Sequence, residues 1–130
     1  MTREVVERYL DALNRHDAAA AASCVSDDFF NEHTSALGTS VRGRAAYSAR
    51  LPAFLAQFRD LHYEIEDVIV DGTRAAVPYR MTCRYSPDGG EDRKVEIRGM
   101  FRFRVENGLI AHRVDYWDGN VFARQIAGAG

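Results

Sequence analysis

Two pairs of polar residues have the types and the spacing for proton-transfer chemistry. Asn31 and His33 stand two apart in "FFNEHT", and Arg113 and Asp115 stand two apart in "HRVDYW". Residues two apart in a β-strand point to the same side. The ordinary pKa of histidine, about 6.5, suits a proton acceptor near neutral pH, and a carboxyl group can serve as its acid partner. The sequence therefore predicts acid/base chemistry if both pairs face one cavity.

Alternation alone does not show whether Asn31 and His33 face inward. Both faces of this strand begin with an apolar residue, Phe29 on one and Phe30 on the other. The last strand breaks the apolar pattern, with Arg113, Asp115 and Trp117 on one face. Buried charges are costly unless paired, and their pKa values shift, so such groups mark candidate sites. The alternative is a partly solvated ion pair of Arg113 and Asp115 at the rim of the fold.

Three helices are predicted in the first half of the chain. Residues 3–15 and 44–58 each carry an apolar stripe at helical spacing, and residues 18–25 begin with five alanines. The pattern then changes to alternation, which is typical of strands. A short strand is predicted at 26–34, and a four-stranded meander at 61–70, 73–86, 93–105 and 109–117.

Helices grouped before an antiparallel sheet indicate an α+β fold, which we expect to form one domain over residues 1–130. A curved sheet wrapped around the helices leaves a cone with one open end, the kind of concavity that ligands use. The alternation predicts the side chains that face into the cone from the two long middle strands. They are Val77, Tyr79, Met81, Cys83 and Tyr85 in one strand, and Val95, Ile97, Gly99, Phe101 and Phe103 in the other.

Composition restricts the class of protein. The net charge is −2, so no positive field exists to recruit nucleic acid or an anionic membrane. No segment approaches the roughly 20 apolar residues of a membrane span, and no apolar leader is seen, so we expect a cytoplasmic protein. Cys24 and Cys83 lack metal spacing and are expected to be buried free thiols. Arginines far outnumber the single lysine, Lys94, which hints at a GC-rich bacterial source.

Several stretches resemble the NTF2-like superfamily, and within it the SnoaL-like polyketide cyclases and the related ketosteroid isomerases. They are "VVERYLDALNRHD", "VSDDFFNEH", "VRGRAAY", "FRDLHYEIEDVIVDGTRAAV" and "VDYWDGNVFARQIAG", which together span nearly the whole chain. The resemblance implies a cone-shaped NTF2-like (cystatin-like) fold, with three N-terminal helices packed on a curved antiparallel sheet.

The resemblance also implies site residues. His33 stands where the isomerases carry their general-base aspartate, which would turn Asn31 and His33 into the cavity and Glu32 outward. Tyr9 matches their oxyanion-hole tyrosine in the first helix. Their second oxyanion donor is a protonated aspartate, and its place here is taken by Gly99, so ketosteroid isomerase activity itself is not expected.

The acid on the last strand has two candidates. Alignment of "YW" with the isomerases turns Arg113, Asp115 and Trp117 inward, whereas counting back from the tail favours Asp118. We expect Asp115 to be the pocket acid and Asp118 to lie in the turn. The predicted substrate-binding residues are Asn31, Tyr79, Met81, Phe101, Arg113 and Trp117.

These residues predict a small-molecule enzyme of the SnoaL-like type. His33 would remove a proton next to the carbonyl of a hydrophobic substrate, and Asp115 or Tyr9 would donate to the developing oxyanion. An aldol-type cyclisation or an isomerisation would follow, and no metal or organic cofactor is expected. The alternative is a non-catalytic protein that holds a hydrophobic ligand in the same cone.

The outward face of the predicted sheet is rich in arginine. Glutamates interleave with these arginines, so we expect cross-strand ion pairs or the interface of a homodimer, which family members often form through this face, and not a nucleic-acid surface. The residues are Arg80, Arg84, Arg98, Arg102 and Arg104, with Glu64, Glu66 and Glu96.

Overall fold

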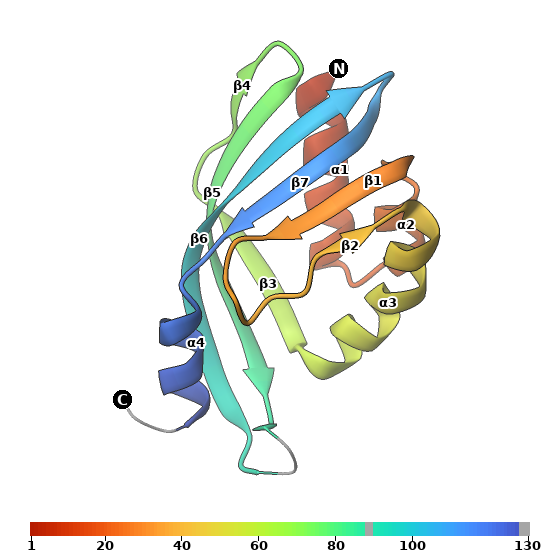
Figure 1. Cartoon of the computed structure of the whole chain (residues 1–130). Helices are drawn as coiled ribbons and strands as arrows, with labels where there is room; N and C mark the ends of the chain where they lie inside the picture. The colour runs from red at the N-terminus through yellow and green to blue at the C-terminus, as the bar shows by residue number, and fades with distance from the viewer. Residues whose placement is uncertain (88–89, 128–130) are drawn as a thin grey trace.

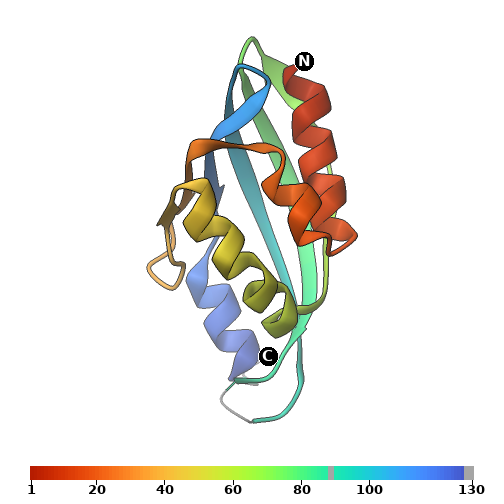
Figure 2. The ribbon, with the colours of Figure 1, turned by 90° about the vertical axis from the view of Figure 1, so that its right-hand side faces the viewer.

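The computed structural model describes residues 1–87 and 90–127 as a curved, unclosed sheet with helices on its concave side (Figure 1). Figure 2 shows α1 and α3 lying across the same face of the strands. The elements are α1 (Thr2–Asn14), α2 (Ala18–Ala22), β1 (Val25–His33), β2 (Val41–Arg42), α3 (Arg44–Gln57), β3 (Arg59–Ile65), β4 (Ile69–Asp71), β5 (Arg74–Tyr85), β6 (Arg93–Glu106), β7 (Leu109–Tyr116) and α4 (Gly119–Ile126).

The sheet is mixed, which corrects the predicted antiparallel sheet. Its strand order is β2-β1-β7-β6-β5-β3, with β4 paired to β5. The meander strands pair antiparallel, but β1 pairs parallel with β7. Parallel neighbours need a long crossover, and here all of the chain between β1 and β7 supplies it. β1 therefore lies beside β7, which is the last strand in chain order but an inner strand of the sheet.

The predicted strand at 61–70 is divided into β3 and β4. The backbone N–H of Glu66 donates to the carbonyl of Pro78 at 2.9 Å, but Pro78 has no N–H to return the bond. The ladder between β3 and β5 ends at that point, and β4 then pairs with the start of β5. The proline explains why one alternating sequence forms two strands.

The core lies between the concave face of the sheet and the helices. In β5 and β6 the predicted inward residues are mostly buried, and Cys24 and Cys83 are buried free thiols, as predicted. Burial raises the pKa of the Cys83 thiol to about 11. From α1 the apolar stripe buries Val5, Val6, Tyr9, Leu10 and Leu13. Among the described residues, no helix is long and apolar enough to span a membrane.

A fourth helix, α4, follows β7 where the sequence predicted only a short tail. The Asp118 carboxylate caps it by accepting from the backbone N–H of Asn120 at 2.9 Å. The side chain of Gln125 then bonds both backbone groups of Glu96 in β6, each at 2.8 Å. This part of β6 extends beyond its pairing with β7, so the Gln125 amide replaces part of the missing ladder.

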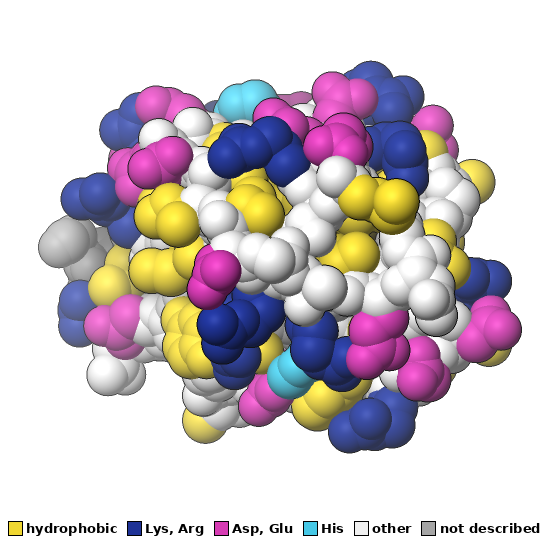
Figure 3. Space-filling model, turned by 90° about the horizontal axis from the view of Figure 1, so that it is seen from above, with side chains coloured by type: hydrophobic (Ala, Val, Ile, Leu, Met, Phe, Trp, Pro, Cys, Tyr) yellow, Lys and Arg dark blue, Asp and Glu magenta, His cyan; other side chains and the backbone are white. Residues whose placement is uncertain are grey.

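Oppositely charged side chains form cross-strand pairs on the outer face of the sheet. Of the two predictions for this face, cross-strand ion pairs or a homodimer interface, the first is confirmed. Arg80 pairs with Glu64 at 2.6 Å and with Glu96 at 3.3 Å, and Arg98 pairs with Glu66 at 3.1 Å. Figure 3 shows the molecule from above, with basic and acidic side chains intermingled. Exposed pairs of this kind contribute about 0–1 kcal/mol each, so they add little to stability.

The Asn14 side chain at the end of α1 is expected to matter more for stability. Its amide nitrogen donates to the carbonyl of Tyr63 at 2.9 Å, and its amide oxygen accepts from the Tyr63 N–H at 2.7 Å. Asn14→Leu leaves both backbone groups without these partners, which should lower the free energy of unfolding by about 1–3 kcal/mol in urea titrations.

Glu7→Gln, an exposed change on the same helix, is the matched control and should alter the free energy of unfolding by less than about 0.5 kcal/mol. Equal stability of the Asn14→Leu variant and the wild type would show that this tether between α1 and β3 contributes nothing.

Candidate active site

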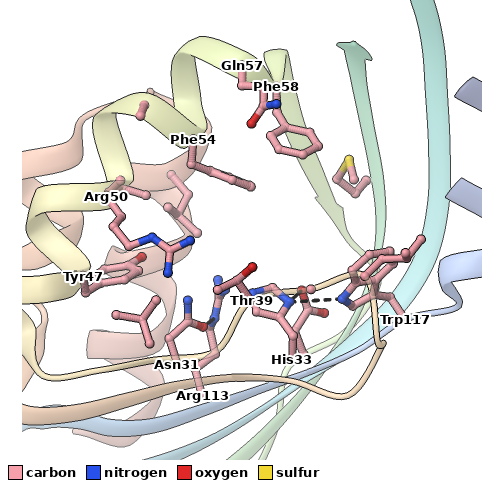
Figure 4. A pocket seen from close by; sticks show the side chains of 18 of the residues that line it. Asn31, His33, Thr39, Tyr47, Arg50, Phe54, Gln57, Phe58, Arg113 and Trp117 are labelled. Carbon is pink, nitrogen blue, oxygen red and sulfur yellow. Dashed lines mark hydrogen bonds and ion pairs between the residues drawn. The ribbon is translucent and has the colours of Figure 1, made fainter. Parts of the chain in front are cut away.

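A cavity of about 540 Å³ lies between α3 and the concave face of the sheet (Figure 4). One end is polar, where Asn31, Arg113, Thr39, Tyr47 and Arg50 meet, and the other end is aromatic. The aromatic end is lined by Phe54, Phe58, Tyr85, Trp117 and Phe122.

The parallel pairing of β1 with β7 joins the two predicted pairs of residues. Asn31 is the register partner of Arg113, and His33 is the register partner of Asp115. All four line the cavity, as the resemblance predicted. Glu32 has the opposite parity and bonds His112 Nε2 at 2.9 Å, away from the cavity lining. Neighbouring strands thus place all four polar groups on one wall.

Arg113 is buried, with 5% of its surface exposed, so the alternative of a solvated rim pair is wrong. Its Nε donates to Asn31 Oδ1 at 2.8 Å, and its Nη1 donates to the Tyr9 hydroxyl at 3.1 Å. Its guanidinium also lies 4.9 Å from the ring centre of Phe101. The guanidinium is thereby fixed from three sides.

Asp115 is equally buried and is held by Tyr79. The Tyr79 hydroxyl donates to Asp115 Oδ1 at 2.5 Å. Burial raises the pKa of the Asp115 carboxyl above its ordinary value, although the charge of Arg113 and the bond from Tyr79 act in the opposite direction. A Cβ atom on Gly99 would lie 2.4 Å from the Tyr79 hydroxyl, so only glycine leaves room for this contact. The isomerases carry an aspartate at the position of Gly99. In this chain the Tyr79 hydroxyl lies against Gly99 and fills the space that a side chain there would need.

His33 is a weaker proton acceptor than the sequence predicted. Its Nδ1 accepts a hydrogen bond from Trp117 Nε1–H at 3.1 Å and lies 3.7 Å from Asp115 Oδ2. Burial, followed by the charges of Arg113 and Arg50, lowers the pKa of His33 to about 3. The imidazole is therefore neutral near pH 7, with its acceptor nitrogen occupied and its proton on Nε2.

Two of the predicted site residues lie behind the cavity lining. Tyr9 is fully buried, and its hydroxyl lies 2.5 Å from the Tyr47 hydroxyl and accepts from Arg113. Phe101 is also fully buried and packs against Tyr79. Both can support Arg113, whereas Tyr79, Met81 and Trp117 line the cavity directly. Asp118 caps α4 and does not line the cavity.

The sequence reasoning missed the contribution of α3 to the site. Tyr47, Arg50 and Phe54 all line the cavity from this helix. They stand at i, i+3 and i+7, which is one face of a helix. The predicted helix at 44–58 carries an apolar stripe, and Arg50 interrupts that stripe. An arginine at a position of an otherwise apolar face was the signal that could have identified it.

The polar groups of the cavity suit acid/base chemistry with organic molecules. Within residues 1–87 and 90–127, no three His, Cys, Asp or Glu side chains gather in a way that could hold a metal ion. The cavity instead offers one carboxyl group, two guanidinium groups, one neutral imidazole and several tyrosines. A buried carboxyl with a raised pKa is a group that can both accept and return a proton.

Comparisons with known proteins identify a family and a fold. The SnoaL-like domain family matches residues 6–113. No curated protein sequence matches the chain significantly. Among solved structures, a provisionally named SnoaL-like polyketide cyclase from Shewanella denitrificans has a TM-score of 0.87 at 16% identity, covering 98% of this chain and 97% of that one.

Two further structures widen the range of names on this fold. An NTF2-like protein of unknown function from Cytophaga hutchinsonii has a TM-score of 0.74 at 18% identity, covering 95% of each chain. An epoxide hydrolase of the LEH-like type from M. tuberculosis has a TM-score of 0.81 at 19% identity, covering 98% of this chain and 90% of that one. The fold is therefore NTF2-like, and at these identities the likeness carries no reaction with it.

The environment of His33 predicts how stability depends on pH. The pKa of His33 is about 3 in the folded chain and about 6.5 in the unfolded chain, so below pH 6.5 the unfolded chain binds a proton that the folded chain lacks. The free energy of unfolding should therefore fall by up to about 1.4 kcal/mol per pH unit between these values on account of this residue.

The measurement compares urea unfolding of the wild type and of His33→Gln between pH 7 and pH 4. The wild type should lose stability more steeply, and its His33 NMR signals should not titrate between pH 8 and pH 5. A midpoint for His33 near pH 6.5, or equal slopes for the two proteins, would contradict this description of the site.

Proposed function

The chain belongs to the SnoaL-like domain family, and we propose that it is an acid/base enzyme acting on an apolar, carbonyl-bearing small molecule. The observation that supports this proposal most directly is the buried Asp115 carboxyl in the cavity wall. Tyr79 holds Oδ1 of this carboxyl, while Oδ2 has no hydrogen-bond partner within the described part of the chain. Asp115 thus takes the role of base that the sequence first suggested for His33.

The proposed reaction begins with ionised Asp115. Its Oδ2 takes a proton from the carbon beside the substrate carbonyl, the C–H electron pair moves into the C–C bond, and the carbonyl oxygen gains the negative charge. Asp115 is then a carboxylic acid and can return the proton. Burial raises the pKa of Asp115, which makes its carboxylate a stronger base than one in water.

Positive and hydrogen-bonding groups near Asp115 would stabilise the enolate oxygen. The buried Arg113 guanidinium is fixed before the substrate arrives, so it needs no reorganisation when charge develops. Neutral His33 retains an N–H on Nε2 and can donate a hydrogen bond. His33 therefore serves as a donor in this proposal, held in place by its bond from Trp117.

Two reactions of the enolate fit this cavity. Return of the proton to a different carbon gives an isomerisation. Attack of the enolate carbon on a second carbonyl of the same molecule gives an aldol-type cyclisation, for which the aromatic end of the cavity would fold the chain of the substrate. Both reactions use the same first step, so the first step is what an experiment should test.

Hydrogen–deuterium exchange of a model ketone tests the proton transfer. In D₂O, the wild type should accelerate the exchange of the α-protons of 2-tetralone, followed by ¹H NMR. Asp115→Asn removes the base and should reduce the protein-catalysed rate by a factor of about 10²–10⁴. Asp118→Asn, which changes the other candidate acid at the cap of α4, should leave the rate within about twofold.

The non-catalytic alternative makes the opposite prediction. A protein that only binds its ligand would take up 2-tetralone without accelerating exchange, and Asp115→Asn would then have no rate to remove. Equal exchange rates for the wild type and Asp115→Asn would likewise exclude Asp115 as the base.

A further inference from the structure

We propose that the ligand carries a carboxylate group, which binds between Arg50 and the free Nη2 of Arg113 at the polar end of the cavity. This inference rests on the proposed function, because it adds an anionic group to the same carbonyl-bearing molecule. It gives a role to Arg50, which the proton-transfer chemistry does not use, and a second role to Arg113.

Arg50 is an exposed cation that lines the cavity and has no protein partner within residues 1–87 and 90–127. It forms no ion pair and no side-chain hydrogen bond with any residue in the described ranges, whereas Arg44 on the same helix bonds both Asp27 and the carbonyl of Val25. In Figure 4 the Arg50 side chain extends from α3 into the cavity, with its guanidinium directed toward Asn31 and Arg113. The unpaired charge therefore faces the space that a ligand would occupy.

Arg113 offers a second donor at the same end of the cavity. Its Nε and Nη1 have partners in Asn31 and Tyr9, but Nη2 has none among the residues that the structure describes. The residue is 5% exposed and lines the cavity. Although Nη2 has no partner among these residues, it is not sealed inside the protein and keeps some accessible surface. Because Arg113 lines the cavity, this surface is reached from the cavity. A buried guanidinium with two free N–H groups on its cavity side fits a bound anion.

The charges of the cavity favour an anion with a single negative charge. Arg113 and ionised Asp115 balance each other, and His33 is neutral near pH 7. Arg50 then leaves one unmatched positive charge. Two guanidinium groups present planar sets of N–H donors that match the two oxygens of a carboxylate. A carboxylate satisfies both the charge and the free donors, whereas a neutral ligand leaves the charge of Arg50 unmatched.

The position of these arginines also restricts the shape of the ligand. Arg113 and Asp115 are two residues apart on one strand face, which places them roughly 7 Å apart along the strand. The carboxylate and the carbon that loses its proton should be separated by a similar distance. Beyond Asp115, the aromatic end of the cavity would cover the apolar body of the molecule. The substrate class is therefore an apolar carbonyl compound with a carboxylate at its polar end.

A matched pair of probes tests this inference without any turnover. The anion 2-naphthoate and its neutral analogue 2-naphthamide share one apolar body, and isothermal titration calorimetry measures the binding of each. The wild type should bind 2-naphthoate at least 10-fold more tightly than 2-naphthamide. Arg50→Gln should weaken 2-naphthoate binding at least 10-fold and leave 2-naphthamide binding within about twofold.

Arg8→Gln is the charge-matched control, because Arg8 is an exposed arginine of α1 that does not line the cavity. It should leave both affinities unchanged, and Arg50→Lys should recover part of the preference for 2-naphthoate. Circular dichroism of each variant confirms folding. Affinity for 2-naphthoate no greater than for 2-naphthamide in the wild type, or an equal loss of both in Arg50→Gln, would overturn the inference.

The two proposals can fail separately. Asp115→Asn removes a negative charge without touching Arg50, so it should keep or strengthen the preference for 2-naphthoate. A clear carboxylate preference with no exchange of 2-tetralone would contradict only the proton transfer. Exchange that depends on Asp115, without any carboxylate preference, would contradict only the anion site.

Discussion

The structure depends on keeping one arginine buried in the wall of its cavity. Removing a guanidinium from water costs several kcal/mol unless charges and hydrogen bonds compensate it. Here Asn31 from β1 and Tyr9 from α1 accept two of the bonds of Arg113, and Tyr9 in turn contacts Tyr47 of α3. One polar network therefore joins both long helices to the parallel pair of strands at the centre of the molecule.

This network separates the cavity into a fixed wall and a reactive surface. Tyr9 and Phe101 hold Arg113 from behind, and Tyr79 holds Asp115 over the space left by Gly99. Groups that are already oriented before a ligand binds can stabilise developing charge without reorganising, which is the main electrostatic advantage of a preformed site. Few groups are then left free toward the ligand. In the proposed reaction Asp115 is the base, and Arg113 and His33 stabilise the enolate oxygen.

An NTF2-like fold supplies the cone but not the reaction, because structures with the same fold carry names as different as cyclase and epoxide hydrolase. The chemistry has to be read from the side chains of each cavity. In this chain, Gly99 stands where the isomerases carry a protonated aspartate, and the Tyr79 hydroxyl fills the space beside it. The same wall thus offers a carboxyl held by a tyrosine, next to a histidine kept neutral by burial and by neighbouring arginines.

The sequence by itself determined the three helices in the first half of the chain, most of the strands and the inward faces of β5 and β6, because helical and strand periods report local burial; it did not predict α4. Together with the family resemblance, the sequence also predicted that Asn31, His33, Arg113 and Asp115 face the cavity. Only the tertiary structure decided that β1 pairs parallel with β7, that Trp117 occupies the basic nitrogen of His33, and that Arg50 enters the cavity. These features depend on contacts between residues far apart in the chain. A local pattern shows which side of a strand is buried, but it does not show which distant side chain lies there.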